Sequence, residues 1–546
     1  MERDINRLTS SAFCNPDVNQ RTPTTASLWV VRSNRLKLAI TMLLAPACSD
    51  WSERTAQQEE ATTTIPVTGV SGPTMIYQQS ETGLNVQTLP TGNVATAAYN
   101  DLTYEDSGGY VNFTPTDRFI FPGASQLGYS FSVNGGAFQY GYPTPSSKLR
   151  PPPGWSVLWG DPAITGSRAY QQYVYISNVA VNNASFPASG FIEGSVTFGS
   201  GGKQSFISGA CIARSSDYGQ TFSLAASDCV KNVTAVPTGD FYDGGSMESD
   251  LEGRIYASWV NWSTGSIDVW WAQTPTSSFT RIITPTGPLA GFTAESHARL
   301  RYDPIADRIY LMALVDPIAP VFGDSNRNTG HLMIDYFDPN SGTWHGAVNV
   351  ANDCLDQPDI IRGTILGLPA KLRTAVSFSF DVGRASPSGG DDIRIVYAGE
   401  TSALPAAHLK SVVCSRGLAC MGGTMNTLGS PGEQFNPLVV AQYGFLSIPS
   451  QWKVSWSSTE FDPGLSGTTL STMETDFGNF PIIATFNQPL CPDQRGYWGD
   501  YDDMQILSAA AGANTFIRAR TESADRCQYR TLFAAKPLHV TALEFQ

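Results

Sequence analysis

The 546-residue chain has little charge, little histidine and no long apolar run. Charged residues make up 15% of it, and it contains five histidines. Its 34 basic and 48 acidic residues leave a formal net charge of −14, which argues against nucleic acid as a partner because phosphate binding needs a basic face. No CxxC pair occurs, so we expect no structural zinc site.

What the chain has in plenty is glycine and proline, 50 and 35 residues, with 11% aromatics. From about residue 75 onward no helical period is found, and short β-rich runs alternate with turn signals. This composition excludes a coiled coil, a helical bundle or a disordered acidic chain. It favours an all-β protein of many short strands joined by tight turns.

The N-terminal part of the sequence resembles an export signal. Arg32, Arg35 and Lys37 precede an apolar run at 38–44 that is too short to span a bilayer. The run leads into an Ala-x-Ala site followed by Cys48, which predicts a signal peptide over 32–48 with a lipobox-like end. We expect Cys48 to be lipidated, with ordinary cleavage and release as the alternative.

The predicted signal peptide divides the rest of the chain into segments and indicates where the protein is located. Residues 1–31 are predicted to be an unstructured, over-extended start, and residues 49–72 a flexible tether. Residues 73–546 would form the folded domain, which we expect to be a monomer. The protein would be exported, either as an outer-membrane or cell-surface lipoprotein or in secreted form, and would meet a membrane only through its lipid anchor.

Export makes the cysteines candidates for disulfides. Two pairs are close enough in sequence to close hairpin-scale loops, and a third could staple the C-terminal repeat, which leaves Cys354 over. The pairs are Cys211/Cys229, Cys414/Cys420 and Cys491/Cys527.

A strand of aromatic and β-branched residues recurs along the chain with a mean period of about 70 residues, which suits the blades of a β-propeller, each a four-stranded antiparallel sheet. Seven copies favour seven blades, with six as the alternative. A terminal strand, such as 74–78 or 540–545, would close the ring by pairing into the blade at the opposite end. The copies lie at 96–100, 173–181, 254–262, 308–315, 392–399, 452–458 and 515–521.

One motif carries a family resemblance. The segment 212–222 contains Ser215-x-Asp217-x-Gly219-x-Thr221-Phe222, in which Ser and Asp can bond to turn N–H groups while Gly takes a positive φ. A shortened copy at 130–138 has Asn in the Asp place. With these boxes, residues 75–546 resemble the sialidase-like (BNR, or Asp-box, repeat) propellers. The resemblance implies a carbohydrate-directed protein in which Ser215, Asp217, Gly219 and Phe222 are structural residues of an outer turn.

Candidate chemistry lies where the innermost strands of the blades begin. Polar residues in the same phase of successive blades would form a ring there, namely Asp161, Asp243, Glu295, His297, Glu433, Asp500 and Tyr501. Glycoside hydrolysis uses paired carboxylates, so the pool for a hydrolase is Asp161, Asp243, Glu433 and Asp500. As the alternative, such Asp residues cap the turns that enter the strands.

The segment 295–302 places Glu295, His297, Arg299 and Arg301 on one face of an expected strand. Blade strands are buried on both faces, so these groups either pair as an inter-blade network or line a wet channel. For the second case we predict that Glu295, His297, Arg299 and Tyr501 bind substrate.

Sialidases themselves bind the substrate carboxylate with three arginines and carry an early Arg-Ile-Pro motif. That motif is absent here, and no local motif supports mapping Arg299, Arg373 and Arg495 onto the three arginines. The departure argues against sialidase activity.

The sequence therefore predicts an exported propeller that binds or hydrolyses extracellular carbohydrate, by resemblance a glycoside hydrolase. The alternatives are a non-catalytic module that binds a glycan or a protein, and a polysaccharide lyase with His297 or Tyr501 as the base. No metal or cofactor is expected. Calcium at the acidic turns 391–392 and 500–503 is the one alternative to that.

Overall fold

The computed structural model describes the chain in segments that all belong to one compact unit, residues 58–546. The predicted start (1–31) and the signal with Cys48 lie outside these segments. The described residues are 63–66, 79–89, 92–101, 110–112, 118–120, 123, 125, 127–134, 139–140, 149–182, 191–192, 208–230, 242–284, 287–294, 297–316, 330–355, 378–383, 392–401, 404–423, 434–442, 450–458, 469–476, 479–489, 503–508, 514–523 and 538–545.

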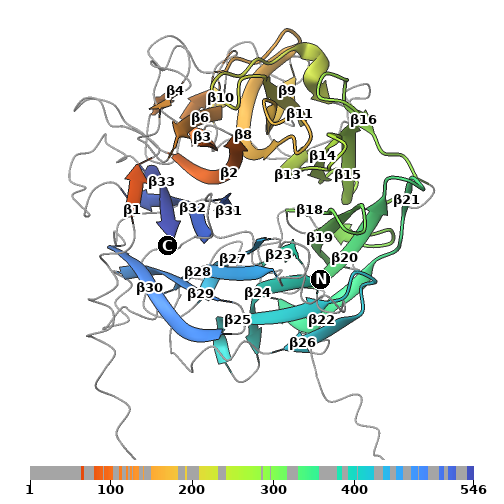
Figure 1. Ribbon diagram of the computed structural model, residues 1–546. Helices are drawn as coiled ribbons and strands as arrows, with labels where there is room; N and C mark the ends of the chain where they lie inside the picture. The colour runs from red at the N-terminus through yellow and green to blue at the C-terminus, as the bar shows by residue number, and fades with distance from the viewer. Residues whose placement is uncertain are drawn as a thin grey trace, which may run out of the picture. The chain divides into compact units, whose positions relative to one another are not determined.

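These segments form seven antiparallel sheets of four or more strands, which we number as blades in chain order (Figure 1). Blade 1 contains β2 (Gln79–Leu89), β3 (Gly92–Asp101), β6 (Leu127–Val133) and β7 (Gln139–Tyr140). Blade 2 contains β8 (Trp155–Gly166), β9 (Val174–Asn182), β11 (Ser208–Ser215) and β12 (Cys229–Val230). Blade 3 contains β13 (Tyr242–Ser249), β14 (Ile255–Asn261), β15 (Ser266–Ala272) and β16 (Thr280–Arg281).

Blade 4 has its innermost and outermost strands each in two pieces. The inner pieces β17 (Thr293–Ala294) and β18 (Arg299–Asp303) both pair with β19 (Arg308–Asp316). The outer pieces β21 (Thr343–Trp344) and β22 (Val348–Leu355) both pair with β20 (Gly330–Asp338).

The remaining blades are regular. Blade 5 contains β23 (Phe378–Val382), β24 (Ile393–Thr401), β25 (Leu404–Cys414) and β26 (Cys420–Gly423). Blade 6 contains β27 (Gln434–Gln442), β28 (Gln451–Ser458), β29 (Thr469–Asp476) and β30 (Asn479–Pro489). Blade 7 contains β31 (Asp503–Ser508), β32 (Asn514–Ser523), β33 (Leu538–Phe545) and β1 (Thr63–Pro66).

Two small elements lie outside the blades. One is a three-stranded sheet of β4 (Tyr110–Asn112), β5 (Arg118–Ile120) and β10 (Phe191–Ile192). The other is a turn of 3-10 helix, η6 (Ala226–Asp228), before β12. No helix among the described residues has the length and apolar character needed to cross a membrane.

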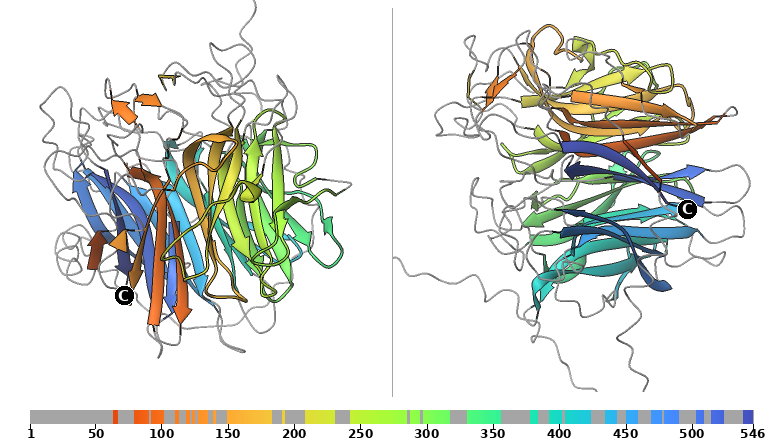
Figure 2. Two further views of the ribbon diagram at one scale, coloured as in Figure 1. Left: turned by 90° about the horizontal axis from the view of Figure 1, so that it is seen from above. Right: turned by 90° about the vertical axis from the view of Figure 1, so that its left-hand side faces the viewer.

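The innermost strands follow one another in a closed ring. In chain order β2, β8, β13, β18, β23, β27 and β31 each contact the next, and β31 contacts β2 again. Figure 2 shows from two further sides that the sheets stand side by side. The prediction of an all-β propeller of four-stranded antiparallel blades is therefore confirmed, and the described part of the chain contains the favoured number of blades.

The ring is closed by a strand from the N-terminal side of the domain. β1 pairs antiparallel with β33, with Thr63 opposite Glu544 and Pro66 opposite Thr541. Residues 540–545 stay in their own C-terminal blade, so the prediction that they would pair into the opposite blade is wrong. The closing strand is residues 63–66, which lie within the predicted tether, and residues 74–78 lie outside the described residues. The pairing covers the edge of β33 that would otherwise be open.

The recurrent strand of the sequence is the second strand of each blade. All seven copies fall on β3, β9, β14, β19, β24, β28 and β32. In β14 every residue is buried, because a second strand has a strand on either side and another blade against each face. The apolar core accordingly lies between blades: Met312 and Leu314 of blade 4, for example, pack in one cluster with Phe380 and Ile395 of blade 5.

Two of the predicted disulfides are present, Cys211–Cys229 and Cys414–Cys420. Each joins directly opposed residues of the third and fourth strands of its blade. The pair Cys491/Cys527 lies outside the described residues.

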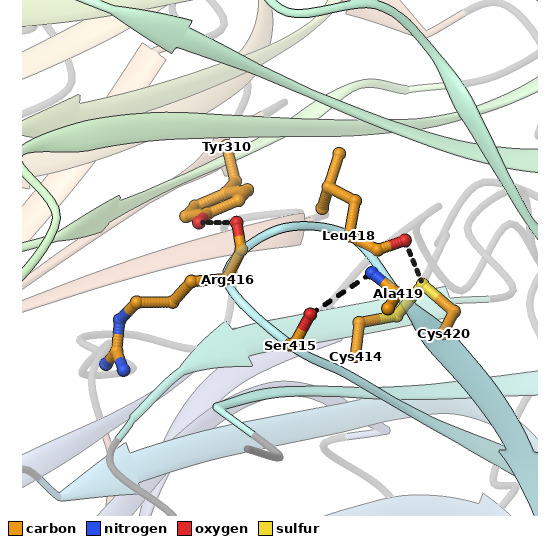
Figure 3. Close-up of a disulfide and its surroundings, with 7 residues drawn as sticks. All are labelled: Tyr310, Cys414, Ser415, Arg416, Leu418, Ala419 and Cys420. Carbon is orange, nitrogen blue, oxygen red and sulfur yellow. Dashed lines mark hydrogen bonds between the residues drawn. A yellow bond between two sulfur atoms is a disulfide. The ribbon is translucent and has the colours of Figure 1, made fainter. Parts of the chain in front are cut away.

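The shorter disulfide loop carries an arginine that joins two blades. Arg416 lies between Cys414 and Cys420, and its guanidinium pairs with the buried carboxylates of Asp303 at 2.5 Å and Asp392 at 2.5 Å. Its carbonyl accepts a hydrogen bond of 2.8 Å from the Tyr310 hydroxyl of blade 4 (Figure 3). The loop therefore links blade 5 to blade 4.

Removing the disulfides should lower stability according to loop length. The two loops span 18 and 6 residues of sequence separation. Chain entropy predicts a loss of unfolding free energy of about 3 kcal/mol for Cys211→Ala/Cys229→Ala and about 2 kcal/mol for Cys414→Ala/Cys420→Ala. Urea unfolding of the two double variants beside the wild type measures both. A larger loss for the shorter loop would instead mean that its disulfide acts mainly by holding Arg416 in the folded state.

Candidate functional site

Two carboxylates and an imidazole from three neighbouring blades converge near the axis of the ring. Asp161 lies on β8, Asp243 on β13, and His297 in the break between β17 and β18. A carboxylate oxygen or ring nitrogen of each lies within 4.8 Å of those of the other two. All three residues are half-buried. Part of the ring of polar groups expected from the sequence is thus formed; we call Asp161 and Asp243 the carboxylate pair.

A β-bulge places Asp161. The pairing of β8 with β9 shifts on both sides of Gly160, and Asp161 takes a φ of 51°, a conformation that Asp tolerates better than most residues. The Asp161 N–H donates to Asn100 Oδ1 at 2.7 Å, and Asn100 Nδ2 lies 3.5 Å from Asp161 Oδ1. A Cβ on Gly160 would lie 2.2 Å from Asn100 Oδ1, so the position requires glycine.

A second bulge, in β13, places Asp243. Its Oδ1 accepts a hydrogen bond of 2.9 Å from the Gly244 N–H, and its Oδ2 accepts one of 3.1 Å from Trp262 Nε1. Gly244 has a φ of 56°, and a Cβ there would lie 2.2 Å from His297 Cδ2. Glycine therefore allows the imidazole to approach the backbone beside Asp243.

The other predicted site residues divide into two groups. Arg299 begins β18, two residues after His297, and lines the cavity described below. Glu295, Glu433, Asp500 and Tyr501 lie outside the described residues, so their roles stay predictions. Arg373 and Arg495 lie outside them as well.

Sequence reasoning missed two residues that hold the carboxylate pair. Asn100 lies near the end of β3 and Trp262 directly follows β14. Both stand at the ends of copies of the recurrent strand, where the chain leaves the core. A polar or aromatic residue at the last position of a recurrent strand was the sequence signal that could have identified them.

A cavity of about 390 Å³ lies beside the carboxylate pair, along the axis of the ring; His297 lines it, whereas Asp161 and Asp243 do not. Residues of all seven innermost strands line it. On β8 and β13 the lining begins just after the pair, with Pro162 and Gly245, and on the third blade it begins with His297 itself. The pair is therefore adjacent in the chain to lining residues, with Asp161 directly before Pro162 and Asp243 two residues before Gly245.

The charged side chains of the cavity form pairs between blades. Arg301 on β18 lies 3.7 Å from Asp381 on β23, and Arg168, just after β8, lies 3.1 Å from Glu248 on β13. The sequence left open an inter-blade network or a wet channel for the charged face of 295–302. The structure shows both, since Arg301 pairs across blades and also lines the cavity with Arg299.

Carboxylates also join the inner strands through backbone hydrogen bonds. Asp381 accepts a hydrogen bond of 2.7 Å from the Ala441 N–H of the next blade. Asp503 accepts one of 3.0 Å from the Leu84 N–H, across the closure of the ring. Burial raises the pKa of Asp381 to about 6, although Arg301 opposes the shift. Burial likewise raises the pKa of Asp503, again against Arg301.

The Asp-box lies at the outer turn between β11 and β12. The Ser215 hydroxyl donates to Asp217 and accepts from the Gly219 N–H at 2.8 Å, and Asp217 accepts from the Thr221 N–H at 2.8 Å. Phe222 packs edge-on against Tyr129 of blade 1, with ring centroids 4.7 Å apart. Among the described residues that line the cavity, none belongs to this box.

The side chains of the site could also bind a metal ion. The oxygens and nitrogen of Asp161, Asp243 and His297 are close enough together to hold a metal ion. The acidic turns proposed for calcium are engaged otherwise where they are described: Asp392 pairs with Arg416 at 2.5 Å, and Asp503 binds backbone N–H groups. The expectation of no metal stays a prediction.

Comparison with known proteins does not assign the chain to a family. No protein-family model matches it, so membership of the sialidase-like family is not confirmed, and no curated protein sequence matches it. An ulvan lyase from a new family of polysaccharide lyases is similar in structure, with 10% identity and a TM-score of 0.41 over 87% of this chain and 97% of the lyase.

Two further solved structures are similar. The polysaccharide lyase Uly1 has 8% identity and a TM-score of 0.35 over 88% of this chain and 100% of its own. An α-L-arabinofuranosidase from Lactobacillus brevis has 10% identity and a TM-score of 0.30 over 57% and 92%. All three proteins are named as enzymes of carbohydrate, but at these TM-scores the likeness carries no weight for the function of this chain.

The raised pKa of Asp381 predicts a pH dependence of stability. Because its folded pKa of about 6 lies above the ordinary 3.8, the native state binds the proton more tightly, and the free energy of unfolding falls as pH rises from about 4 to about 6. In Asp381→Asn this loss, on the order of 3 kcal/mol, should be absent. The free energy of unfolding of the variant, relative to that of the wild type, should therefore increase with pH. Urea unfolding between pH 4.5 and 7.5 measures this difference.

Asp217→Asn is the matched control. Burial raises the pKa of Asp217, but hydrogen bonds from Thr221 and Ser215 outweigh it and hold that pKa below 3.8. Its contribution is therefore complete throughout the tested range, and the difference from the wild type should stay constant. A constant difference for Asp381→Asn as well would show that Arg301 and the backbone N–H groups fully offset the burial.

Proposed function

We propose that the protein hydrolyses glycosidic bonds of extracellular carbohydrate at the carboxylate pair. The observation that carries the proposal is the convergence of Asp161, Asp243 and His297, from three blades, beside a polar cavity. Glycoside hydrolysis needs two carboxyl groups on either side of the scissile bond. The two bulges and two special glycines, all at one point of the ring, serve to aim these side chains.

The spacing of the pair favours retention of configuration. A carboxylate oxygen of Asp161 and one of Asp243 lie within 4.8 Å of each other, short of the roughly 6.5–9.5 Å between the carboxyl groups of inverting hydrolases. Asp243 receives N–H donors at both oxygens, which stabilise negative charge and suit a nucleophile. We assign Asp161, whose Oδ1 lies 3.5 Å from Asn100 Nδ2, as the acid and base.

The reaction balances with these two residues. An Asp243 oxygen bonds to the anomeric carbon while the glycosidic C–O bond breaks, and Asp161 gives its proton to the leaving oxygen. Water then attacks the anomeric carbon, Asp161 takes its proton, and the Asp243 ester bond breaks. His297 contacts the same space and orients the substrate.

The test uses the full chain against neutral and uronate polysaccharides and sialosides, with reducing ends and the ultraviolet absorbance of unsaturated uronate read together. We expect new reducing ends without absorbance, with the anomeric configuration retained by NMR. Asp161→Asn and Asp243→Asn should each lower the rate at least about 100-fold. Glu252→Gln, at an exposed turn after β13, is the matched control and should keep the wild-type rate.

Other outcomes have distinct meanings. Absorbance from unsaturated uronate would identify a lyase, and inversion would contradict the assignment of Asp243 as nucleophile. Hydrolysis that survives in both Asp variants would move the site elsewhere. No product from any polymer would leave non-catalytic glycan binding, which the mutually paired charges of the cavity favour as the second candidate.

We further propose that the protein works outside the cytoplasm. Two disulfides among the described residues support this, because disulfides persist in oxidising compartments. Lipidation of Cys48 and the monomeric state stay predictions, and mass spectrometry of the native product tests the lipid.

A further inference from the structure

Two amide side chains of β2 lie in the cavity without an evident role in the fold. Asn85 and Gln87 are 8% and 7% exposed, project from the same face of the strand and line the cavity. Gly166 on β8 makes room for them, since a Cβ there would lie 1.5 Å from Gln87 Nε2 and 2.8 Å from Asn85 Oδ1. No other residue could stand at position 166 without displacing the amides.

The Asn85 amide has an N–H group that bonds to no described residue. Its Nδ2 is buried and has no hydrogen-bond partner among the described residues. An N–H group in a cavity wall that has no protein partner can donate to an acceptor on a molecule that enters the cavity, and it favours a ligand that carries one.

The charges of the cavity wall are balanced. Arginines 168, 299 and 301 face Glu248, Asp381 and Asp503 in the same lining. Two of these form inter-blade pairs, Arg168–Glu248 and Arg301–Asp381. A ligand with a full charge would lose its hydration and meet a wall whose charges already compensate one another.

A ligand that both donates and accepts without net charge suits this wall. Hydroxyl groups do so: each can accept from an amide or guanidinium and donate to a carboxylate. The volume of about 390 Å³ lies within the roughly 300–1,000 Å³ of small-molecule sites. The cavity also lies beside the carboxylate pair, since Pro162, Gly245 and His297 line it.

We propose that the cavity binds one neutral sugar residue of the substrate through its hydroxyl groups, with Asn85 as a donor, and discriminates against uronates. This inference rests on the proposed hydrolysis, because it places the sugar next to the scissile bond. It names the substrate class as neutral glycans.

The experiment compares sugars that differ only at one carbon. Calorimetric titration of the full chain at pH 7.5 uses D-galactose against D-galacturonate and D-glucose against D-glucuronate. At least one neutral sugar should bind about tenfold more tightly than its uronate. Asn85→Ala should lower the affinity for the neutral sugar by about 3- to 10-fold, which corresponds to the loss of one hydrogen bond. Asn340→Ala, at an exposed turn after β20, is the control and should bind as the wild type does.

Several results would overturn the inference: tighter binding of a uronate, no binding of either neutral sugar, or unchanged affinity in Asn85→Ala. Thermal unfolding of each variant checks its folding, and Gln87→Ala replaces Asn85→Ala if the latter is unstable. The hydrolysis assay keeps the two proposals apart. Cleavage of uronate polymers without binding of neutral sugars would retain the hydrolase and reject the neutral site, whereas binding without cleavage of any polymer would reject the hydrolase.

Discussion

The structure depends on how the backbone N–H groups at the free edges of the innermost strands find hydrogen-bond acceptors. Each is the edge of its sheet, so its outward N–H groups face the axis, where no further strand can pair with them. Side chains of the preceding blade supply the acceptors: Ser246 for Leu300, Ser379 for Val439, Asp381 for Ala441 and Asp503 for Leu84. The last of these, with β1 on β33, closes the ring.

This solution explains why the cavity is charged. The carboxylates that serve as acceptors for the backbone, Asp381 and Asp503, are half-buried, and withdrawing a charge from water is costly unless it is compensated. Arg301 lies near both Asp381 and Asp503 and lowers the cost for each. The polar wall is thus first a requirement of the propeller, and a site for polar ligands follows from it at little further cost.

The candidate site uses a second constraint, the irregularity of the inner strands. A regular strand buried between blades could not present Asp161 or Asp243 beside the axis together with His297 of a third blade. The bulges in β8 and β13 and the break between β17 and β18 turn these side chains to one point. Gly160 and Gly244 are the residues that make the turns sterically feasible.

The sequence alone determined the strand repeat, two disulfides and the phase of Asp161, Asp243 and His297, because these are local patterns of burial, turn chemistry and spacing. It favoured seven blades over six, and the closed ring of the structure decided between them. It could not assign Asn100 and Trp262 to the carboxylates, pair Arg301 with Asp381, or find Asn85 in the cavity. Nor did it foresee that residues 63–66 would close the ring. Those contacts join residues about 20 to 480 positions apart in the chain, and only the closure of the blades around one axis decides which distant side chains meet.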